Sequence, residues 1–447
     1  MKEKILVWLL LGALVQSLSE CEIQLTDSTK KTVIELSENG QSENGQSKNE
    51  QSENAQSGNG QSENGQSKNG QLENEQPERE QSKSGKLKAE QQKDTESGEE
   101  IAGEEPDSPE ITLVMVGDIL LHDPVAESGS REDGSYNFDA IFANVKDRVS
   151  EADLALVNQE VILGGSELGI TGYPCFNAPY ELGDSLVDTG FDVILHGTNH
   201  ALDKGRKGME NCLDFWENTY PDIAVLGINE SAEAQEEIFI FEQDGIRVAI
   251  LNYTYGTNGI SMPENMPYAV NLLEEEKVIE DLKKADKEAD FVIVCPHWGT
   301  EYKLAETEEQ KYWADIFEEN GVDLVIGTHP HVIEPVEWLG EEGNMLVYYS
   351  LGNFVNWTSG TGEGVANRMV GGMAEVTIGP DETGDVVITD YDMEPLICHV
   401  EDGTDGVTVY FMEDYTEELA EKNEIRKQDA NFSMEYCEKL WEEVIGE

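Results

Sequence analysis

The residues of this chain best suited to chemistry are histidines that follow short apolar runs. His329 and His331 stand one residue apart, directly after the run Leu324–Ile326 and Gly327. Because open α/β sheets place their sites at the carboxyl ends of strands, a strand ending there would release both imidazoles into one loop. A lone histidine is more often a packing residue, but six of the seven histidines occupy such loops: His122, His196, His200, His297, His329 and His331. We therefore predict a shared metal site.

These loops offer a mixed set of oxygen and nitrogen ligands. Carboxylate, amide and imidazole groups suit Mn²⁺, Fe or Zn²⁺ better than Ca²⁺ or a thiolate-bound cluster. Six ligands exceed the needs of one tetrahedral ion and fit two divalent ions about 3.5–4 Å apart with a carboxylate between them. Such a pair can polarise a phosphoryl or carbonyl oxygen and activate water near neutral pH. The expected ligands are Asp118, Glu160, Asn199, His297, His329 and His331.

Alternating strand-like and helix-like segments between residues 110 and 395 would position these groups. Apolar runs that read as strands precede the expected ligands: Ile111–Val116, Leu154–Val157, Phe191–Leu195, Phe291–Cys295 and Asp323–Ile326. Helix-like segments lie between strands: Asp139–Val149, Tyr180–Thr189, Leu272–Ala289 and Thr307–Asn320. Met369–Ile378 and Val386–Met393 alternate like antiparallel strands. This order predicts an α/β sandwich with mixed sheets rather than a barrel.

The segments on either side of this domain differ from it. Residues 22–109 are predicted to be a disordered linker, because a five-residue unit, roughly Gln-Ser-x-Asn-x, repeats from Ser37 to about Gly85. Aromatic side chains are absent from the repeat, so no core could offset the chain entropy lost on folding. Residues 396–447 are expected to form a C-terminal helical extension, with a helical pattern over Thr416–Ile445.

The first 21 residues resemble an export signal. Two lysines precede Ile5–Val15, an apolar stretch of signal-peptide length that is short for a transmembrane helix. Leu18–Cys21 resembles the lipobox of bacterial lipoproteins, although Glu20 stands where a small residue is expected. Lipidation of Cys21, an uncleaved N-terminal anchor and simple secretion are the alternatives. All three place the protein outside the cytoplasm, and the first two anchor it to the cell membrane through its N-terminus.

Charge and cysteine spacing exclude some classes of function. The chain has 29 basic and 93 acidic residues, which gives a formal net charge of -64. A surface this acidic repels phosphate backbones, so we predict no nucleic-acid partner. The six cysteines show no CxxC spacing. This argues against a zinc ribbon or a thiol redox site.

Six short motifs look like the signature of a known family. They are Gly117-Asp118, Asn158-x-Glu160, Thr198-Asn-His-Ala-Leu-Asp-x-Gly205, His297-Trp-Gly299, Gly327-x-His-Pro-His331 and Ser350-Leu-Gly-Asn-Phe354. In this order they resemble the CapA family of poly-γ-glutamate capsule synthesis proteins, which is related to calcineurin-like metallophosphoesterases. The resemblance spans residues 111 to about 395. It implies a metallophosphoesterase-like α/β/β/α sandwich with mixed sheets.

The resemblance also implies a role for each ligand. Asp118 and His331 would hold one metal ion, and Asn199, His297 and His329 would hold the other, with Glu160 as the bridge. His200 corresponds to the histidine that protonates a leaving oxygen or contacts the transition-state phosphoryl group. Two departures from the family pattern weaken the expectation of phosphatase activity, while metal binding is still expected. The usual D-x-H opening is missing, with His122 four residues after Asp118, and the usual bridging aspartate is Glu160.

The resemblance and the residues together support three functional hypotheses. The first is an exported, membrane-tethered CapA-like protein in poly-γ-glutamate capsule synthesis or export, with the capsule polymer or its synthase complex in the membrane as partner. The second is a dinuclear-metal hydrolase of phosphate esters or of amide bonds in an envelope polymer. The third is a binding module that holds an acidic polymer without turnover. A pure binding module has no need for six ligands and His200, which favours retained chemistry.

Overall fold

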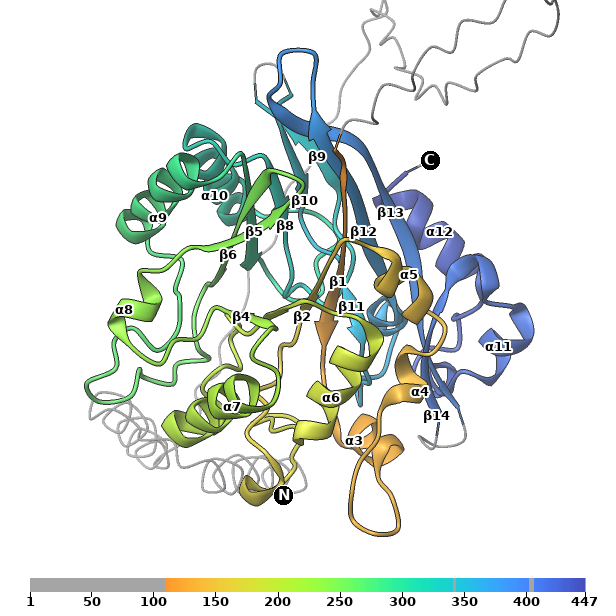
Figure 1. Ribbon diagram of the computed structural model, residues 1–447. Coiled ribbons are helices and arrows are strands. Elements are labelled where there is room, and N and C mark those ends of the chain that lie inside the picture. The colour runs from red at the N-terminus through yellow and green to blue at the C-terminus, as the bar shows by residue number, and fades with distance from the viewer. Residues whose placement is uncertain (1–108, 341–342, 402–405, 447) are drawn as a thin grey trace, which may run out of the picture. The chain divides into compact units, whose positions relative to one another are not determined.

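The computed structural model describes residues 109–340, 343–401 and 406–446 (Figure 1). The predicted signal at 1–21 and nearly all of the predicted linker at 22–109 lie outside the described residues. In the part of the chain that is described, the strands form two sheets. The first sheet contains β1 (Ile111–Ile119), β2 (Leu154–Asn158), β3 (Val193–Leu195), β4 (Ala224–Leu226), β11 (Asn353–Val355), β12 (Val370–Pro380), β13 (Val386–Glu401) and β14 (Gly406–Phe411).

The first sheet is mixed, with β1 at its centre. Its order is β14-β13-β12-β1-β2-β3-β4, and β11 also pairs with β1. Strands β1 to β4 run parallel, whereas β12, β13 and β14 are joined by antiparallel pairing. At the carboxyl end of β1, Asp118 pairs with Asn158 on one side and with Asn353 on the other. Three chain segments distant in sequence therefore meet at Asp118.

The second sheet is also mixed and is built from the middle of the chain. Its order is β5-β6-β7-β8-β10-β9, with the four inner strands parallel and the two edges antiparallel. A tight hairpin joins β5 to β6 through Asp244 and Gly245, both with positive φ, as the Asp-Gly pair favours. The strands are β5 (Phe239–Gln243), β6 (Ile246–Thr254), β7 (Phe291–His297), β8 (Leu324–Ile326), β9 (Val336–Leu339) and β10 (Met345–Tyr348).

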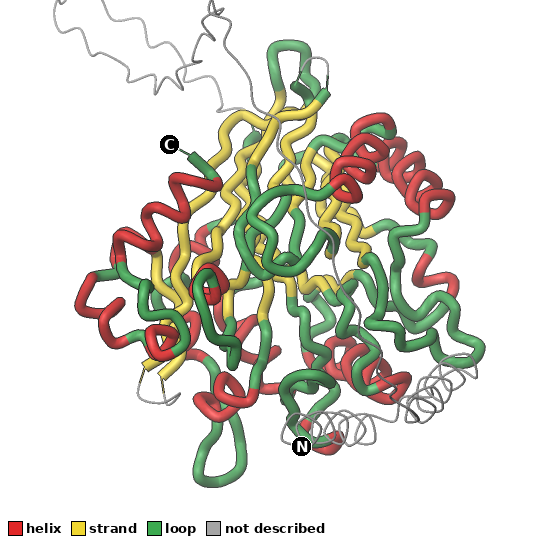
Figure 2. Tube along the Cα trace, turned by 180° about the vertical axis from the view of Figure 1, so that it is seen from behind, coloured by secondary structure: helices red, strands yellow, loops and turns green. Residues whose placement is uncertain are grey.

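The alternation of side chains along β7 shows how the layers stack. Phe291, Ile293 and Cys295 join a core shared with the first sheet. Val292 and Val294 point the other way, into a second core. Figures 1 and 2 show the helices that cover the sheets from two sides. The helices in the described part of the chain are α3 (Asp123–Gly129), α4 (Asp139–Phe142), α5 (Lys146–Glu151), α6 (Tyr180–Thr189), α7 (Gly205–Thr219), α8 (Ala232–Gln235), α9 (Glu275–Glu288), α10 (Glu308–Glu319), α11 (Glu417–Lys422) and α12 (Met434–Val444).

Helices α9 and α10 form the outer layer over the second sheet. Their apolar side chains, among them Leu282 and Phe317, pack into the second core against Val292 and Val294. A capping box at Thr307 and Gln310 starts α10 and satisfies the first amides of the helix. The described residues thus confirm the predicted α/β fold with two mixed sheets. Among them, no helix combines the length and apolar character needed to cross a bilayer.

Two predicted helices are divided by contacts that local sequence does not reveal. The segment Asp139–Val149 forms α4 and α5 separately, and Asn144 Nδ2 between them donates to the Val409 carbonyl of β14. The segment Thr416–Ile445 divides into α11, a 3₁₀ turn and α12. Asn423 fixes this break, because its side chain accepts from the Ile425 amide and donates to the Cys398 carbonyl.

The predicted boundary at residue 395 does not separate a helical extension from the domain. Strand β13 runs through that position to Glu401, and β14 then pairs with it from Gly406 to Phe411. The first part of the expected extension is therefore β-structure in the first sheet. It belongs there because β13 pairs with β12 from Val386 to Ile397, and its last residues, Leu396–Glu401, pair with β14.

Candidate metal centre

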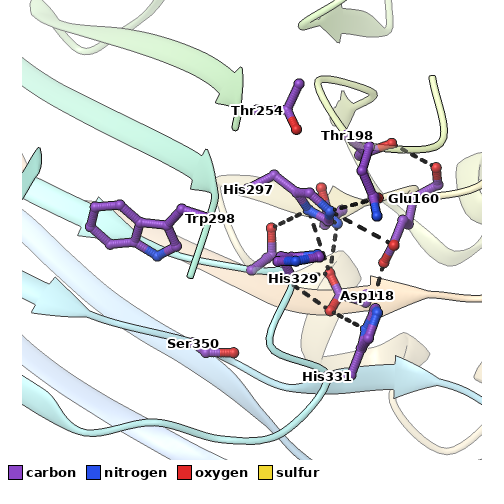
Figure 3. Close-up of polar contacts among 12 residues, drawn as sticks. Asp118, Glu160, Thr198, Thr254, His297, Trp298, His329, His331 and Ser350 are labelled. Carbon is purple, nitrogen blue, oxygen red and sulfur yellow. Dashed lines mark hydrogen bonds and ion pairs between the residues drawn. The ribbon is translucent and has the colours of Figure 1, made fainter. Parts of the chain in front are cut away.

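The candidate site lies where the carboxyl ends of strands from both sheets meet (Figure 3). The first sheet contributes Asp118 at the end of β1 and Glu160 just after β2. The second sheet contributes His297, the last residue of β7, and the loop His329–His331 after β8. A backbone bridge between His297 and Thr328 holds the two histidine segments side by side. The site therefore requires both sheets.

One group of potential ligands gathers around His331. Its Nδ1 lies 3.0 Å from Asp118 Oδ2 and 3.8 Å from Glu160 Oε2. Asn353 Oδ1 lies 3.1 Å from the same nitrogen. The donor atoms of Asp118, Glu160 and His331 all lie within 4.8 Å of one another, and all three residues are buried. Ligand atoms bound to one ion at about 2.1 Å are about 3–4 Å apart, so this spacing suits a shared ion.

A second group uses the other oxygen of Glu160. Glu160 Oε1 lies 3.7 Å from His297 Nε2, and the donor atoms of Glu160, His297 and His329 also fall within 4.8 Å of one another. Asn199 joins this group, because its Oδ1 lies 3.1 Å from His297 Nε2. The structure thus brings together all six predicted ligands, in two groups that share Glu160.

Buried atoms without partners test whether these residues fit a metal. Both oxygens of Glu160 and Nδ1 of His329 are buried and make no hydrogen bond. A buried polar group without a hydrogen bond is costly, and an ionised carboxylate without compensation costs far more. Two cations, one at each Glu160 oxygen, would satisfy all three atoms. The donor set of carboxylates, imidazoles and an amide oxygen suits divalent transition ions.

The protonation of the site supports the same fit. Burial, together with repulsion from His331, lowers the pKa of His329 well below its usual value, and His297 is affected in the same way. Both imidazoles are therefore neutral, the form that binds metal. Burial raises the pKa of Glu160 well above its usual value, so this carboxyl is ionised only with a positive charge beside it. Burial also lowers the pKa of His331, but Glu160 and Asp118 outweigh it and raise the pKa to about 9. A divalent ion could take over the compensating role of that proton.

Surrounding polar groups orient the ligands. Asn158 Nδ2 donates to Asp118 Oδ1 at 2.7 Å, and Thr328 Oγ1 lies 3.1 Å from His297 Nδ1. These contacts leave Asp118 Oδ2 and His297 Nε2 to face the site, an arrangement typical of metal centres. His329 and His331 have φ values of 99° and 60°. Such conformations cost about 1–3 kcal/mol each and persist where surrounding contacts impose them, as they often do at functional sites.

His200 stands beside the bridge rather than in either group. Its Nδ1 lies 2.7 Å from Asp203 Oδ2, and its Nε2 lies 3.8 Å from Glu160 Oε1. The Asp203 carboxylate also accepts the Phe176 amide at 2.7 Å, which fixes its position. Asp203 therefore orients a histidine whose second nitrogen faces the ligands. Such an imidazole could hold a proton for transfer to a leaving group.

His122, which stands near the missing D-x-H position, has a different environment. Its ring meets Phe176 edge to face at 5.1 Å. Burial, with repulsion from His331, lowers the pKa of His122 to about 4. His122 lines the pocket beside the site but belongs to neither ligand group of the described residues. Asn353, rather than His122, lies beside His331, with its Oδ1 3.1 Å from His331 Nδ1.

Three residues of the site were not predicted as functional. Tyr255 follows β6 directly and its ring lies 4.6 Å from that of His329. The rule that strand ends carry site residues could have found it. Tyr302 and Arg368 line a pocket of about 200 Å³ together with His200 and His331. No periodicity or motif in the sequence marks either of these two residues.

Comparison with known families and proteins places this geometry in context. The family model described as "Bacterial capsule synthesis protein PGA_cap" matches residues 112–358. The chain is 34% identical over 177 residues to the PGA biosynthesis protein CapA of Bacillus subtilis (strain 168), covering 39% of this chain and 45% of that protein. It is 28% identical over 269 residues to the capsule biosynthesis protein CapA of Bacillus anthracis, covering 56% of this chain and 62% of that protein. The matches thus span less than two thirds of either relative.

Similar solved structures include phosphatases and nucleotidases. A phosphatase of Mycoplasma pneumoniae has 17% identity and a TM-score of 0.39, with 65% of this chain and 94% of that chain covered. The NAD nucleotidase of Haemophilus influenzae has 12% identity and a TM-score of 0.42, with 66% and 59% covered. A 5'-nucleotidase precursor of Thermus thermophilus has 17% identity and a TM-score of 0.40, with 64% and 54% covered.

Proposed function

Because the chain belongs to the PGA_cap family of bacterial capsule synthesis proteins, we propose that it acts in the synthesis or export of a poly-γ-glutamate capsule. In this proposal it is an extracytoplasmic protein tethered to the cell membrane, with two divalent metal ions at the carboxyl ends of its strands. Its partner is the capsule polymer or the synthase complex that makes it. The names of the two relatives, which refer to PGA and capsule biosynthesis, support this role.

One observation carries the metal part of the proposal, namely that Glu160 is shared by two ligand groups. Its two oxygens are buried without hydrogen bonds and face different histidines. In the proposed centre, Asp118 and His331 hold one ion, and Asn199, His297 and His329 hold the other. Bound ions of this kind polarise a phosphoryl or carbonyl oxygen and lower the pKa of water.

The residues of the chain would supply the remaining chemistry. The Asp203 carboxylate accepts a hydrogen bond from His200 Nδ1 and fixes the orientation of the imidazole. The second nitrogen of His200 would then donate a proton to a leaving oxygen or nitrogen. This pair favours the second candidate function, a metal-dependent hydrolase of phosphate esters or of amide bonds in an envelope polymer. A module that only binds an acidic polymer would have no use for it.

Metal analysis of a bridge variant and a matched control tests the centre. Wild-type protein should retain about two divalent ions after loading and dialysis, and Glu160→Gln should lose at least one, because an amide cannot replace a bridging charge. Glu337→Gln, an exposed change on β9, should keep the wild-type content. Equal metal content in all three proteins would reject the shared bridge. Turnover on phosphoesters and γ-glutamyl peptides then separates the hydrolase from the binding module.

The tether rests on the N-terminal sequence, and cell fractionation tests it. If Cys21 is lipidated, Cys21→Ser should move the protein out of the membrane fraction. If the apolar stretch Ile5–Val15 remains as an uncleaved anchor, the same variant should stay there. Wild-type protein found only in the medium would reject both forms of anchoring.

A further inference from the structure

The pocket beside the ligand groups contains one permanently charged cation. Arg368 is the sole lysine or arginine among the described residues that line it, in a chain with 29 basic and 93 acidic residues. The pocket also contains His200 and His331. A molecule bound in this pocket therefore has Arg368 and both histidines among its neighbours.

Contacts with neutral groups hold Arg368 in place. Its Cζ lies 3.5 Å from the centre of the Tyr302 ring, a close cation–π contact. Its Nη1 donates to Thr358 Oγ1 at 3.0 Å. Its carbonyl accepts from Asn353 Nδ2 at 2.9 Å, and the Oδ1 of the same amide lies 3.1 Å from His331 Nδ1. One asparagine thus links the backbone of Arg368 to a predicted metal ligand.

Tyr302, on which Arg368 lies, is itself fixed to the histidine loop. Its amide donates to the Pro330 carbonyl, between His329 and His331, at 2.7 Å. Its φ of 66° is unfavourable for a tyrosine and needs such a contact to persist. The ring lies 6.0 Å from the His331 ring. The aromatic face is therefore held at a set position relative to the ligand groups.

One carboxylate, that of Glu301, lines the pocket together with Arg368, and the described residues show no ion pair between the two. No carboxylate of the described residues forms an ion pair with Arg368, although acidic residues greatly outnumber basic ones. A guanidinium has five N–H donors, and one of its nitrogens is engaged with Thr358. Planar anionic groups such as carboxylate and phosphate match the remaining donors in pairs.

We propose that Arg368, stacked on Tyr302, is a specificity-determining residue that binds an anionic oxygen group of the substrate, a carboxylate or a phosphate, while the reacting bond lies at the metal groups. This assignment rests on the proposed function, because it places the substrate at that centre. It explains why a strongly acidic protein keeps one unpaired guanidinium there. A polymer of γ-linked glutamate would offer a carboxylate, and a phosphate ester would offer phosphate oxygens.

Binding measurements on the full metal-loaded protein test this residue. The probes are inorganic phosphate and the dipeptide γ-glutamyl-glutamate, each titrated by calorimetry. Arg368→Met should weaken the preferred probe by roughly 10- to 150-fold, as expected for hydrogen bonds to a charged group. Arg206→Met, which removes an exposed arginine on α7, should bind like wild type. The probe that loses affinity identifies the carboxylate or the phosphate as the ligand.

Several outcomes would overturn the assignment. One is equal affinity in Arg368→Met and wild type, and another is no binding of either probe to wild type at millimolar concentration. If Arg368→Met does not fold, Arg368→Lys is measured in its place. Lysine keeps the positive charge but lacks the planar, paired N–H donors of the guanidinium. Unchanged affinity in that variant would also reject the assignment. Metal analysis of the same samples separates the two proposals: wild-type protein without metal would reject the metal centre, while affinity that depends on Arg368 would still support the anion site.

Discussion

Glu334, three residues beyond the histidine loop, should make the stability of the protein depend on pH in a predictable way. Its side chain is fully buried. One oxygen accepts from Gln310 Nε2 at 2.5 Å, and the other has no hydrogen-bond partner. Burial raises the pKa of this carboxyl from 4.5 to about 8. The folded protein therefore keeps a proton at Glu334 that the unfolded chain releases above pH 4.5.

The size of the effect follows from this pKa difference. Between pH 4.5 and 8 the folded state binds more protons than the unfolded state, so the free energy of unfolding falls as pH rises. Within that window, each rise of one pH unit lowers the free energy of unfolding by about 1.4 kcal/mol for this one group. From pH 5 to pH 7 the contribution of Glu334 should fall by about 2–3 kcal/mol. Glu334→Gln removes this titration and keeps an oxygen that can accept from Gln310.

Denaturant unfolding at several pH values measures this difference. Wild type, Glu334→Gln and the exposed control Glu337→Gln are compared with a chelator present, so that the histidine cluster titrates alike in all three. The difference in free energy of unfolding between Glu334→Gln and wild type should increase by about 2–3 kcal/mol from pH 5 to pH 7 in favour of the variant. The difference between Glu337→Gln and wild type should not change with pH in this way. A constant offset between Glu334→Gln and wild type across this range would refute the reasoning, because it would mean that Glu334 is ionised in the folded state.

The remaining predictions concern the metal groups and their neighbours. His329→Ala should lose one ion in metal analysis and melt at a lower temperature, since metal binding adds to the free energy of folding; full metal content would contradict its role as a ligand. His200→Ala should keep both ions and slow any hydrolysis by roughly 10²–10⁴-fold. A wild-type rate in a destabilised His200→Ala protein would show that His200 only packs. Asp203→Asn should slow hydrolysis without loss of metal, because His200 loses its charged acceptor. An unchanged rate would show that Asp203 only holds the loop at Phe176, whose amide donates to it.

The position of the ligands could be predicted from sequence because buried parallel strands leave a clear pattern. Each apolar run ends abruptly, and Asp118, Glu160 and His297 stand at or just after those ends. The assignment of the six groups to two ions came instead from the family resemblance. Local sequence does not encode which imidazole faces which oxygen of Glu160, since those contacts join separate sheets.

The pocket that contains Arg368 and Tyr302 could not be predicted from the sequence, because its geometry depends on contacts between residues distant in sequence. Arg368 lies in a 3₁₀ turn, Val365–Met369, within a connection that has no periodic pattern. It reaches the site through Asn353 and Tyr302. The left-handed backbone of Tyr302 is stabilised by the Pro330 carbonyl and not by its own residue type. Sequence reasoning located the strand ends but not the side chains that approach them from the loops.

The topology of the first sheet has a consequence for how the chain is made. Its central strand, β1, is synthesised first among the described strands, yet its antiparallel neighbour β12 comes much later, with Ile111 opposite Ile378. The entire second sheet is synthesised between them. Until β12 has emerged, β1 can pair with β2 on one side only, and an apolar strand with an open edge is a template for aggregation. If the protein is exported as proposed, the chain should therefore depend most on chaperones outside the cytoplasm, in the interval between the emergence of β1 and that of β12.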